Sequence, residues 1–307
     1  LRDDVTFHNG EKLTAEDVKY TIERASTMPN SATYFAFFDG EGTTVVDDYT
    51  VDIKLTEPFA PVYNYLATAR GSIVCKKTME EMGSEAYGRA PIGSGKFKFT
   101  EWVAGDRVEL TRNDEYWGEK PAYTTLVART IVESANRAIE VETGGVDIAM
   151  TIDPSDVQRL TDNPDTKIVS GPSYTISMLV MNAAKHEIIS DVRVREALSI
   201  AIDIPALVDV IYKGAATVAD SVISNQIQYY KPIGPLEYDP ERAMELLDEA
   251  DFDFSQAIKI YVNSAGQSKD IAEIVRNQWE AIGVTTEIEM VDGAKFGEMY
   301  GSGELMI

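Results

Sequence analysis

Two different periods of apolar and polar residues run through the first 88 positions. Thr14 precedes a run in which apolar residues recur at helical spacing, and Asp17, three positions later, completes a variant of the capping box. Residues 45–55 instead predict a β-hairpin: two valines precede an Asp-Asp turn, and after it apolar and polar positions alternate at 51–55. We also expect a helix at 59–67 and a short strand at 73–75. This stretch is therefore predicted to form a small α+β unit.

From residue 89 onward, segments with strand and helix patterns alternate. Strands are predicted at residues 96–102, 107–112, 126–132, 146–150, 173–182, 258–262 and 284–291. Helices are predicted at 134–143, from 154, at 191–202, from 240, at 270–282 and at 294–300. The helix from 240 has the clearest start, because Asp239 is a preferred N-cap residue and Pro240 suits the first helical position. Such alternation is typical of an α/β sheet.

Length and charge narrow the class of protein. A chain of 307 residues favours two or more domains. Its 51 acidic and 28 basic side chains give a formal net charge of −23, and such a surface repels phosphate backbones, so we expect no nucleic-acid partner. The acidity also suits a cationic ligand, but a solvated surface is the simpler interpretation. No apolar run approaches the roughly 20 residues that a membrane-spanning helix needs.

The sequence carries no motif of an enzyme or of a metal site. Its two histidines and single cysteine form no His-x-x-x-His or Cys-x-x-Cys pair, and no Gly-x-Ser-x-Gly elbow occurs. The glycines at 93–95 lack the ending and the strand-to-helix context of a phosphate loop. We therefore expect no catalytic residue, no metal ligand and no cofactor. A catalytic pair among the many adjacent acids is the remaining enzymatic alternative.

Four short motifs occur in a fixed order along the chain. They read FHNGEKLTAEDV at 7–18, PIGSGKF at 91–97, YWGEKP at 116–121 and RVREALSIAID at 193–203. In this order and at these separations they resemble the large extracytoplasmic solute-binding proteins of peptide, oligopeptide and nickel ABC importers, known as family 5. The resemblance covers the whole chain but only the middle of a family member.

This resemblance implies a type II periplasmic-binding-protein fold of cluster C, with mixed α/β structure and an extra small α+β domain. Residues 1–88 would be that extra domain, 89–173 part of the first α/β lobe, and 174–307 the second lobe, with residues 173–182 as a strand between lobes. The chain is expected to be a fragment that lacks both ends, with an incomplete first lobe and a second lobe truncated at its C-terminus. The family's acidic partner for a peptide amine would follow residue 305. These 307 residues alone are thus expected to bind solute weakly or not at all, and to expose apolar surface that favours self-association.

The resemblance further implies a non-enzymatic role, in which the lobes close over a solute and deliver it to ABC permease subunits. A peptide or oligopeptide is the leading solute class, because the extra domain implies a roomy cleft. A nickel chelate or an oligosaccharide is the alternative within the same fold, and a carboxylate-based hydrolase is a third, less favoured hypothesis. The location would be extracytoplasmic, either the periplasm or a lipid-anchored cell surface, with contact to the membrane only through the permease or an anchor.

Ligand contacts are implied along residues 174–182. In a strand, side chains alternate between faces, so Tyr174 and Met178 would point one way and Ser177 the other. A tyrosine, with an apolar ring and a polar tip, suits a peptide site. Burial of Tyr174 and Met178 in a core is an equally good interpretation of the same pattern.

Two other stretches hold weaker candidates. The resemblance makes Tyr34 the aromatic residue of the small domain that covers the ligand. Asn225 and Gln226 lie in the SNQIQYY loop, where they either read a peptide backbone or simply coat the loop.

Several motif residues are expected to serve structure. Gly10 suits a turn with positive φ, and Gly93 and Gly95 let the backbone pass close to a neighbour. Trp117 is expected to anchor a core. Cys75 is placed in the short apolar strand at 73–75, where a buried thiol is inert.

Overall fold

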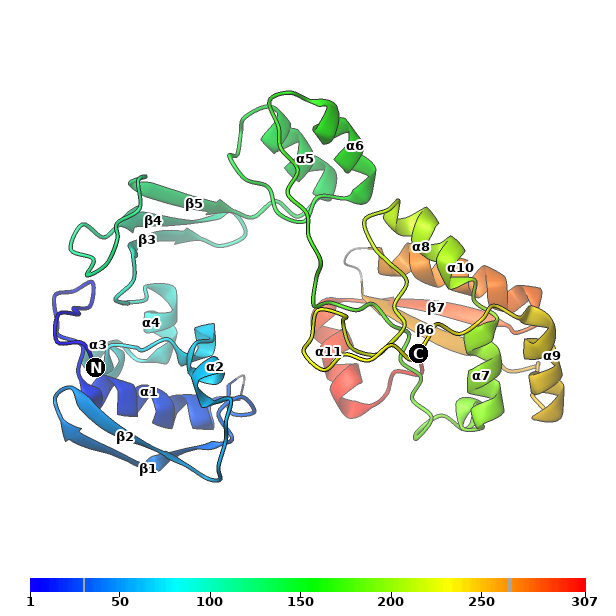
Figure 1. The fold of residues 1–307 in the computed structure, drawn as a ribbon, viewed down its shortest axis with the longest axis horizontal. Coiled ribbons are helices and arrows are strands. Elements are labelled where there is room, and N and C mark those ends of the chain that lie inside the picture. The colour runs from blue at the N-terminus through cyan, green and yellow to red at the C-terminus, as the bar shows by residue number, and fades with distance from the viewer. Residues whose placement is uncertain (30, 264–266) are drawn as a thin grey trace. The chain divides into compact units, whose positions relative to one another are not determined.

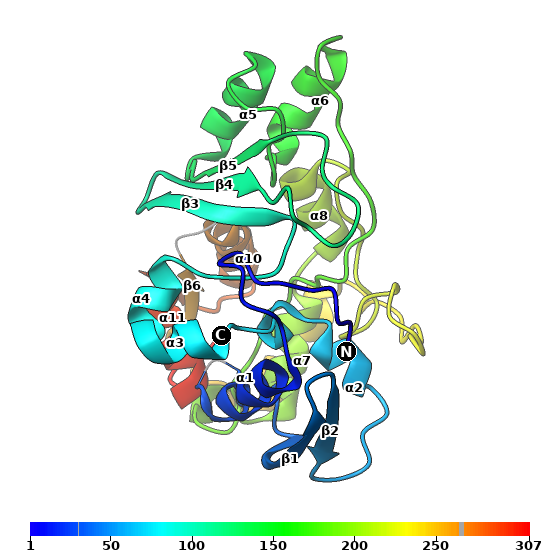
Figure 2. The ribbon, with the colours of Figure 1, turned by 90° about the vertical axis from the view of Figure 1, so that its left-hand side faces the viewer.

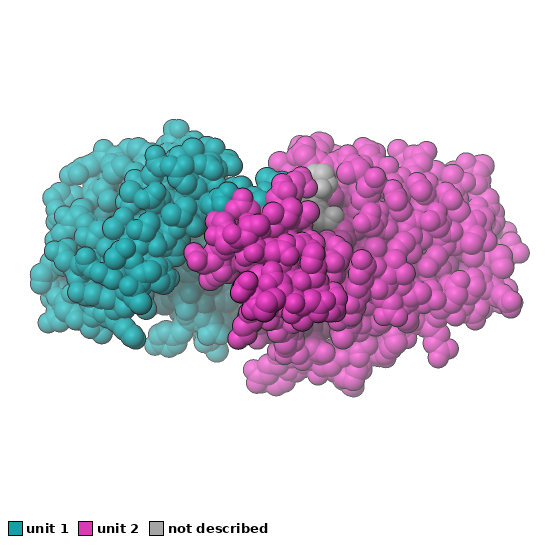
Figure 3. All heavy atoms as spheres, turned by 90° about the horizontal axis from the view of Figure 1, so that it is seen from above, with its two compact units in different colours: residues 1–132 teal, residues 133–307 magenta. Residues whose placement is uncertain are grey.

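The computed structural model describes residues 1–29, 31–263 and 267–307. It divides into two compact units, Leu1–Val132 and Glu133–Ile307 (Figure 3). Mixed α/β structure occurs throughout, as predicted. The finer division at residues 88 and 173 stays a prediction. Among the described residues, no helix combines the length and the apolar character that crossing a bilayer requires.

The first half of unit 1 is a helix packed on a hairpin (Figures 1 and 2). Its elements are α1 (Ala15–Thr27), β1 (Phe38–Asp47), β2 (Thr50–Leu55), α2 (Val62–Leu66), a 3-10 turn (Ala69–Gly71), α3 (Lys76–Met82) and α4 (Ser84–Arg89). Strands β1 and β2 pair antiparallel. The buried side of α1 carries apolar residues at the predicted helical spacing, namely Val18, Ile22 and Ala25, which pack with Phe35 and Phe38 in one core. The helix and the hairpin are therefore confirmed.

The strand predicted at residues 73–75 does not form. These residues are irregular and lead directly into α3, with Cys75 at its N-cap position. The reason lies in their backbone N–H groups, which bond to side chains instead of a neighbouring strand. Val74 donates to the Thr21 hydroxyl at 3.1 Å, and Cys75 donates to the Tyr87 hydroxyl at 3.2 Å. Burial of Cys75 is nevertheless as expected, since it is 2% exposed.

The second half of unit 1 is an antiparallel sheet of β3 (Phe97–Val103), β4 (Arg107–Arg112) and β5 (Thr125–Arg129) in that order. All three strands were predicted, although β5 ends three residues earlier than expected.

Three of the four sequence motifs meet beside this sheet. His8 lies against Gly93 and Gly95: its N–H donates to the Gly93 carbonyl at 2.8 Å, and its ring nitrogens contact the Gly93 N–H and the Gly95 carbonyl. Trp117 donates its indole N–H to the Ser94 carbonyl at 3.3 Å. His8 is thus the neighbour of Gly93, but a Cβ at position 93 would meet the His8 ring at an ordinary 3.5 Å and one at position 95 would meet nothing within 4 Å, so the prediction that a close backbone approach requires glycine here is wrong. The core role predicted for Trp117 is wrong, because this side chain is 41% exposed. Gly10 has the expected positive φ, at +88°.

Unit 2 opens with a helix pair, α5 (Ser134–Glu142) and α6 (Pro154–Asp162), both predicted. The strand expected between them at 146–150 is absent. Ile148 and Met150 are 81% and 77% exposed, and no described strand pairs with this stretch. A strand requires a partner for its backbone groups, and Arg137 instead donates to the carbonyls of Met150 and Thr151.

The rest of unit 2 is an α/β core (Figure 1). Its elements are α7 (Val192–Ile200), α8 (Ile204–Tyr212), α9 (Pro240–Glu249), β6 (Ile258–Asn263), α10 (Ser268–Ala281), β7 (Thr286–Val291) and α11 (Gly293–Ser302). Strands β6 and β7 are parallel, and α10 packs on both. Trp279 of α10 is fully buried, and its indole N–H donates to the Leu198 carbonyl of α7 at 2.8 Å. This bond satisfies the single polar atom of the largest buried side chain.

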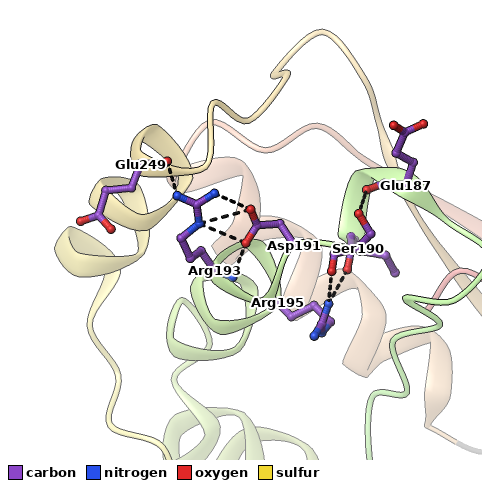
Figure 4. A network of polar contacts seen from close by, with 7 residues as sticks. Glu187, Ser190, Asp191, Arg193, Arg195 and Glu249 are labelled. Atoms are coloured by element: carbon purple, nitrogen blue, oxygen red, sulfur yellow. Dashed lines mark hydrogen bonds and ion pairs between the residues drawn. The ribbon is translucent and has the colours of Figure 1, made fainter.

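Two arginines of the fourth motif, residues 193–203, form the hydrogen bonds that hold the start of α7 in place (Figure 4). Arg193 binds the Asp191 carboxylate and also donates to the Glu249 carbonyl at the end of α9. This guanidinium, followed by the backbone N–H of Arg193, lowers the pKa of Asp191 to about 2. Arg195 turns elsewhere and donates to the carbonyls of Ile189 and Ser190. Residues two positions apart on a helix point to different sides, and the two arginines accordingly serve different contacts.

The strand predicted at residues 173–182 is also absent. The segment is neither strand nor helix, and both it and its partners lie in unit 2. Its polar anchors are single bonds, such as the Asn182 N–H to the Met306 carbonyl at 3.0 Å. Isolated hydrogen bonds of this kind fix the position of a segment but do not form the regular pattern of a paired strand. The alternation of side chains that a strand imposes therefore does not apply to this segment.

Candidate functional site

Five of the six candidate residues lie on two segments of unit 2 that are bonded to each other. Ser224, which is 6% exposed, donates its hydroxyl to the Ser173 carbonyl at 2.8 Å. The hydroxyl oxygen of Ser224 also accepts the Gln226 N–H at 3.2 Å. This one buried serine thus fixes the loop that carries Asn225 and Gln226 against the start of the segment that carries Tyr174.

The 173–178 segment is also tied to helix α8. The Ser177 and Tyr212 hydroxyls lie 3.3 Å apart, within hydrogen-bonding distance. Because Tyr212 is the last residue of α8, the helix places this hydroxyl pair at its C-terminal end. Sequence reasoning missed Tyr212; its position at the end of an apolar run, just before Gly214, was the available signal.

Tyr174 and Met178 are on the surface of unit 2. Their exposed fractions are 73% and 56%, so the interpretation that places them in a core is wrong. Large apolar side chains at a surface mark contact sites more often when they cluster with polar groups. Here the polar groups are the Ser177–Tyr212 hydroxyl pair and the amides of Asn225 and Gln226. We name this set of six residues the Tyr174 surface.

The loop beside the Tyr174 surface has a defined shape. The Tyr230 hydroxyl donates to the Asp220 carboxylate, and the Ile233 N–H donates to the Asp220 carbonyl at 3.1 Å. The hydrogen bond to Asp220 raises the pKa of Tyr230, with desolvation as the second cause. Tyr229 has φ of +70° and is 89% exposed. Asp220 therefore closes the loop and leaves Tyr229 on the outside.

Tyr34, the sixth candidate, belongs to unit 1. It is 41% exposed, and the Arg70 guanidinium lies over its ring at 4.0 Å from the centroid. Tyr65 borders the same ring at 6.4 Å between centroids. Sequence reasoning missed Arg70, which sits between the α2 helix and the irregular stretch before α3. An arginine in a segment otherwise poor in charge was the signal that could have found it.

A groove of about 290 Å³ lies within unit 1, near Tyr34. Its walls come from the C-terminal half of α1, from the turn that follows, and from residues 69–74. Arg24, Arg70 and Ser72 are among the lining residues. This volume is at the lower end of what small-molecule sites occupy.

Neither unit shows a cluster suited to a metal among the residues that the structure describes. His8 is engaged with Gly93 and Gly95, and desolvation lowers its pKa below the ordinary value of 6.5. The Tyr174 surface and the Arg70 groove offer aromatic faces, hydroxyls, amides and guanidinium groups. Such groups are suited to holding a polar organic molecule by hydrogen bonds and ring contacts.

Known proteins resemble this chain along its full length. The family described as bacterial extracellular solute-binding proteins, family 5 middle, matches residues 1–307. A curated relative, the glutathione-binding protein GsiB of Pectobacterium atrosepticum, is 29% identical over 307 residues, which cover 99% of this chain and 59% of the relative.

Two solved structures extend the comparison. DppA of Helicobacter pylori, an ABC transporter-associated periplasmic binding protein in complex with the peptide STSA, has a TM-score of 0.86 and 27% identity. The alignment covers all of this chain and 64% of DppA. NikZ of Campylobacter jejuni in complex with Ni(L-His) has a TM-score of 0.81 and 25% identity, with 96% and 62% covered. The chain thus spans about three fifths of the length of the relatives it matches.

Proposed function

Because this chain belongs to family 5 of the bacterial extracellular solute-binding proteins, we propose that it captures a small organic solute for an ABC importer. The type II periplasmic-binding-protein fold expected from the motifs is confirmed by the likeness to DppA and NikZ. Capture outside the cytoplasmic membrane and delivery to permease subunits are the parts of the proposal that go beyond family and fold.

The observation that carries the proposal is the exposure of Tyr174 and Met178 beside polar side chains. Aromatic and thioether groups offer apolar contact to a bound molecule, and fixed hydroxyls and amides beside them give it orientation. The Tyr174 surface has this composition. In the proposal, the protein exchanges between open and closed states, and a second surface covers the solute in the closed state. Because the closed state binds the solute more tightly, the solute shifts the population toward it.

A peptide or peptide-like molecule is the solute class we favour. Tyrosine rings, serine hydroxyls and side-chain amides pair with peptide groups and with short side chains of varied shape. The DppA structure contains a tetrapeptide, and GsiB is named for glutathione, itself a peptide. The evidence for this chain is the chemistry of its own Tyr174 surface, and the relatives add support.

A nickel chelate is the second candidate, supported by the NikZ structure with Ni(L-His). In such a complex the chelator presents an organic surface, so a binding site needs no metal cluster of its own. An oligosaccharide remains the third candidate, since exposed tyrosines also pack on sugar rings.

Equilibrium dialysis of the chain against a mixture of short peptides, nickel chelates and oligosaccharides, with the retained solute identified by mass spectrometry, separates these classes. We expect peptides of two to five residues to be released on denaturation, and no turnover when a peptide mixture is incubated with the protein. Release of a nickel chelate or a sugar would replace the peptide assignment. Cleavage of the peptides would contradict the transport role and favour the hydrolase hypothesis.

A further inference from the structure

Strand β5 forms an open edge of the three-stranded sheet of unit 1 (Figure 1). Its pairing with β4 shows which of its backbone groups face outward. The Arg112 N–H donates to the Thr124 carbonyl, and the register continues without a shift, so the even-numbered residues of β5 bond to β4. The N–H and C=O groups of Thr125 and Val127 therefore point away from the sheet, and no residue that the structure describes bonds to them there.

The other strands that the structure describes are protected against pairing with a further strand. The register of β1 is irregular at two places and that of β3 at one. Charged residues lie inside β2, β6 and β7. Irregular registers and charged side chains of this kind prevent association between sheet edges. Strand β5 has neither protection, because its register is continuous and residues 122–128 hold no charged residue, no proline and no glycine.

Charge does not oppose association at this sheet. Residues 89–132, which contain the sheet, hold seven basic and six acidic side chains. The large excess of 51 acidic over 28 basic side chains in the whole chain therefore comes from other segments. A nearly neutral sheet edge on an otherwise acidic protein is the region where two copies repel each other least.

We propose that β5 is a dimerisation surface, at which two copies of this chain pair their β5 strands antiparallel about a two-fold axis. The strand is complementary to itself when the axis passes beside Leu126. Thr125 of one copy then faces Val127 of the other, and their outward N–H and C=O groups bond in both directions. A second copy is the partner we favour, because symmetry matches the two edges in register and in charge.

Leu126 lies at the centre of this pairing. Its own backbone groups bond to β4, so the Leu126 residues of the two copies form a pair without hydrogen bonds between them. The Cα atoms of such a pair lie about 4.5 Å apart, and their side chains are in contact. The pairing also covers part of Val127, which is 48% exposed. It uses no donor or acceptor of Arg129, the one charged residue of β5.

Sedimentation velocity of the 307-residue chain, with no solute added, is the first test. We expect a monomer–dimer equilibrium that shifts toward the dimer as salt screens the acidic surfaces. Val127→Lys places a charge at the edge and should weaken the dimer by about 10-fold or more. Val46→Lys, the same change at a valine of β1 that is 59% exposed, is the matched control and should leave the dissociation constant unchanged. Unchanged melting temperatures show that both variants are folded.

Cross-linking is the second test and checks the register. In a Cys75→Ser background, Leu126→Cys should form a disulfide between copies in oxidised glutathione, because the pair at the axis lies within disulfide distance. Thr125→Cys faces position 127 of the other copy and should cross-link about 10-fold more slowly or less.

Three results would overturn the proposal: a monomer at every protein concentration, an unchanged dissociation constant for Val127→Lys, or equal cross-linking of the two cysteines. Binding of an unrelated extended peptide to β5 of a monomeric chain, seen as shifts of the β5 amides in NMR spectra, would assign the edge to another partner and also overturn it. None of these results bears on solute capture, because the sedimentation and cross-linking samples contain no solute.

Discussion

The Asp17 carboxylate joins two helix starts, because one of its oxygens accepts the Lys76 N–H at 2.9 Å at the beginning of α3. The other oxygen accepts the Thr14 N–H at 2.9 Å, at the beginning of α1. Asp17 is 7% exposed, so water does not replace these bonds when they are lost. A residue that the sequence marks only as part of a capping box thus also positions a helix about 60 residues away.

Replacing Asp17 by alanine should reduce the free energy of unfolding by about 2–4 kcal/mol, because two helix caps are lost at once and buried donors are left without partners. Chemical denaturation measures the change. Asp52→Ala, on the exposed side of strand β2, should change it by less than about 0.5 kcal/mol. Similar losses for the two variants would show that the shared carboxylate has no special role.

Stability should depend on pH through His8. The Nδ1 atom accepts the Gly93 N–H at 3.3 Å and Nε2 lies 3.0 Å from the Gly95 carbonyl, a pair of bonds that requires the neutral ring with its proton on Nε2. Desolvation lowers the pKa of His8, Lys98 lowers it further, and the Gly95 carbonyl opposes both. Because the unfolded chain binds the proton at higher pH than the folded chain, the contribution of His8 is fully present above about pH 6.5 and declines as the pH falls toward the folded pKa.

His8→Gln should flatten this part of the stability profile, since glutamine does not titrate. Ring NMR measures the pKa directly, and with only two histidines in the chain the assignment needs a single His186→Gln control. A pKa of His8 at or above 6.5, or an Nδ1–H tautomer, would disprove the assignment.

Trp279→Phe should lower the free energy of unfolding by about 1–3 kcal/mol. The substitution removes the bond to the Leu198 carbonyl and leaves that acceptor buried, while the smaller ring leaves space in the core. Trp102→Phe, at a position 45% exposed, is the control with an expected change below about 0.5 kcal/mol. A larger loss of unfolding free energy for Trp102→Phe than for Trp279→Phe would show that the position assigned to the core is wrong.

Cys75 should react slowly with thiol reagents in the folded protein. Its side chain is 2% exposed, and reagents reach it only when the surrounding structure opens. Labelling with a chromogenic disulfide should be at least about 100-fold slower than in denaturant. Cysteine placed at exposed Lys120 in a Cys75→Ser background should label quickly, and equally rapid labelling of Cys75 would contradict the burial.

Local signals in the sequence were sufficient for most helices. Asp239 caps α9 through the Arg242 N–H, and Asp17 completes the box at Thr14, since caps depend on residues a few positions apart. Apolar spacing predicted the helix at 270–282, but it does not rank neighbouring faces and therefore did not identify Trp279 as a fully buried residue of α10.

The incorrect predictions share a cause, which is hydrogen bonding to residues far away in the sequence. The stretch at 73–75 reads as a strand, but Thr21 and Tyr87 take its backbone donors, and apolar composition reveals neither. The same limit applies to the sites. The sequence indicated Tyr174 and Tyr34 as candidates. The Ser224 hydrogen bond that fixes the Tyr174 surface and the stacking of Arg70 on Tyr34 could be found only from the structure.

Calorimetric titration of the 307-residue chain with an equimolar mixture of tripeptides tests the central proposal most directly. We expect saturable binding of low affinity with a stoichiometry near one, weakened by a further factor of about 10 or more when Tyr174 and Met178 are both replaced by alanine. Tyr63→Ala, which removes an equally exposed aromatic side chain from unit 1, should leave the affinity unchanged. Absence of binding by wild type, or equal affinity of wild type and the double variant, would contradict the proposal that the Tyr174 surface captures a peptide.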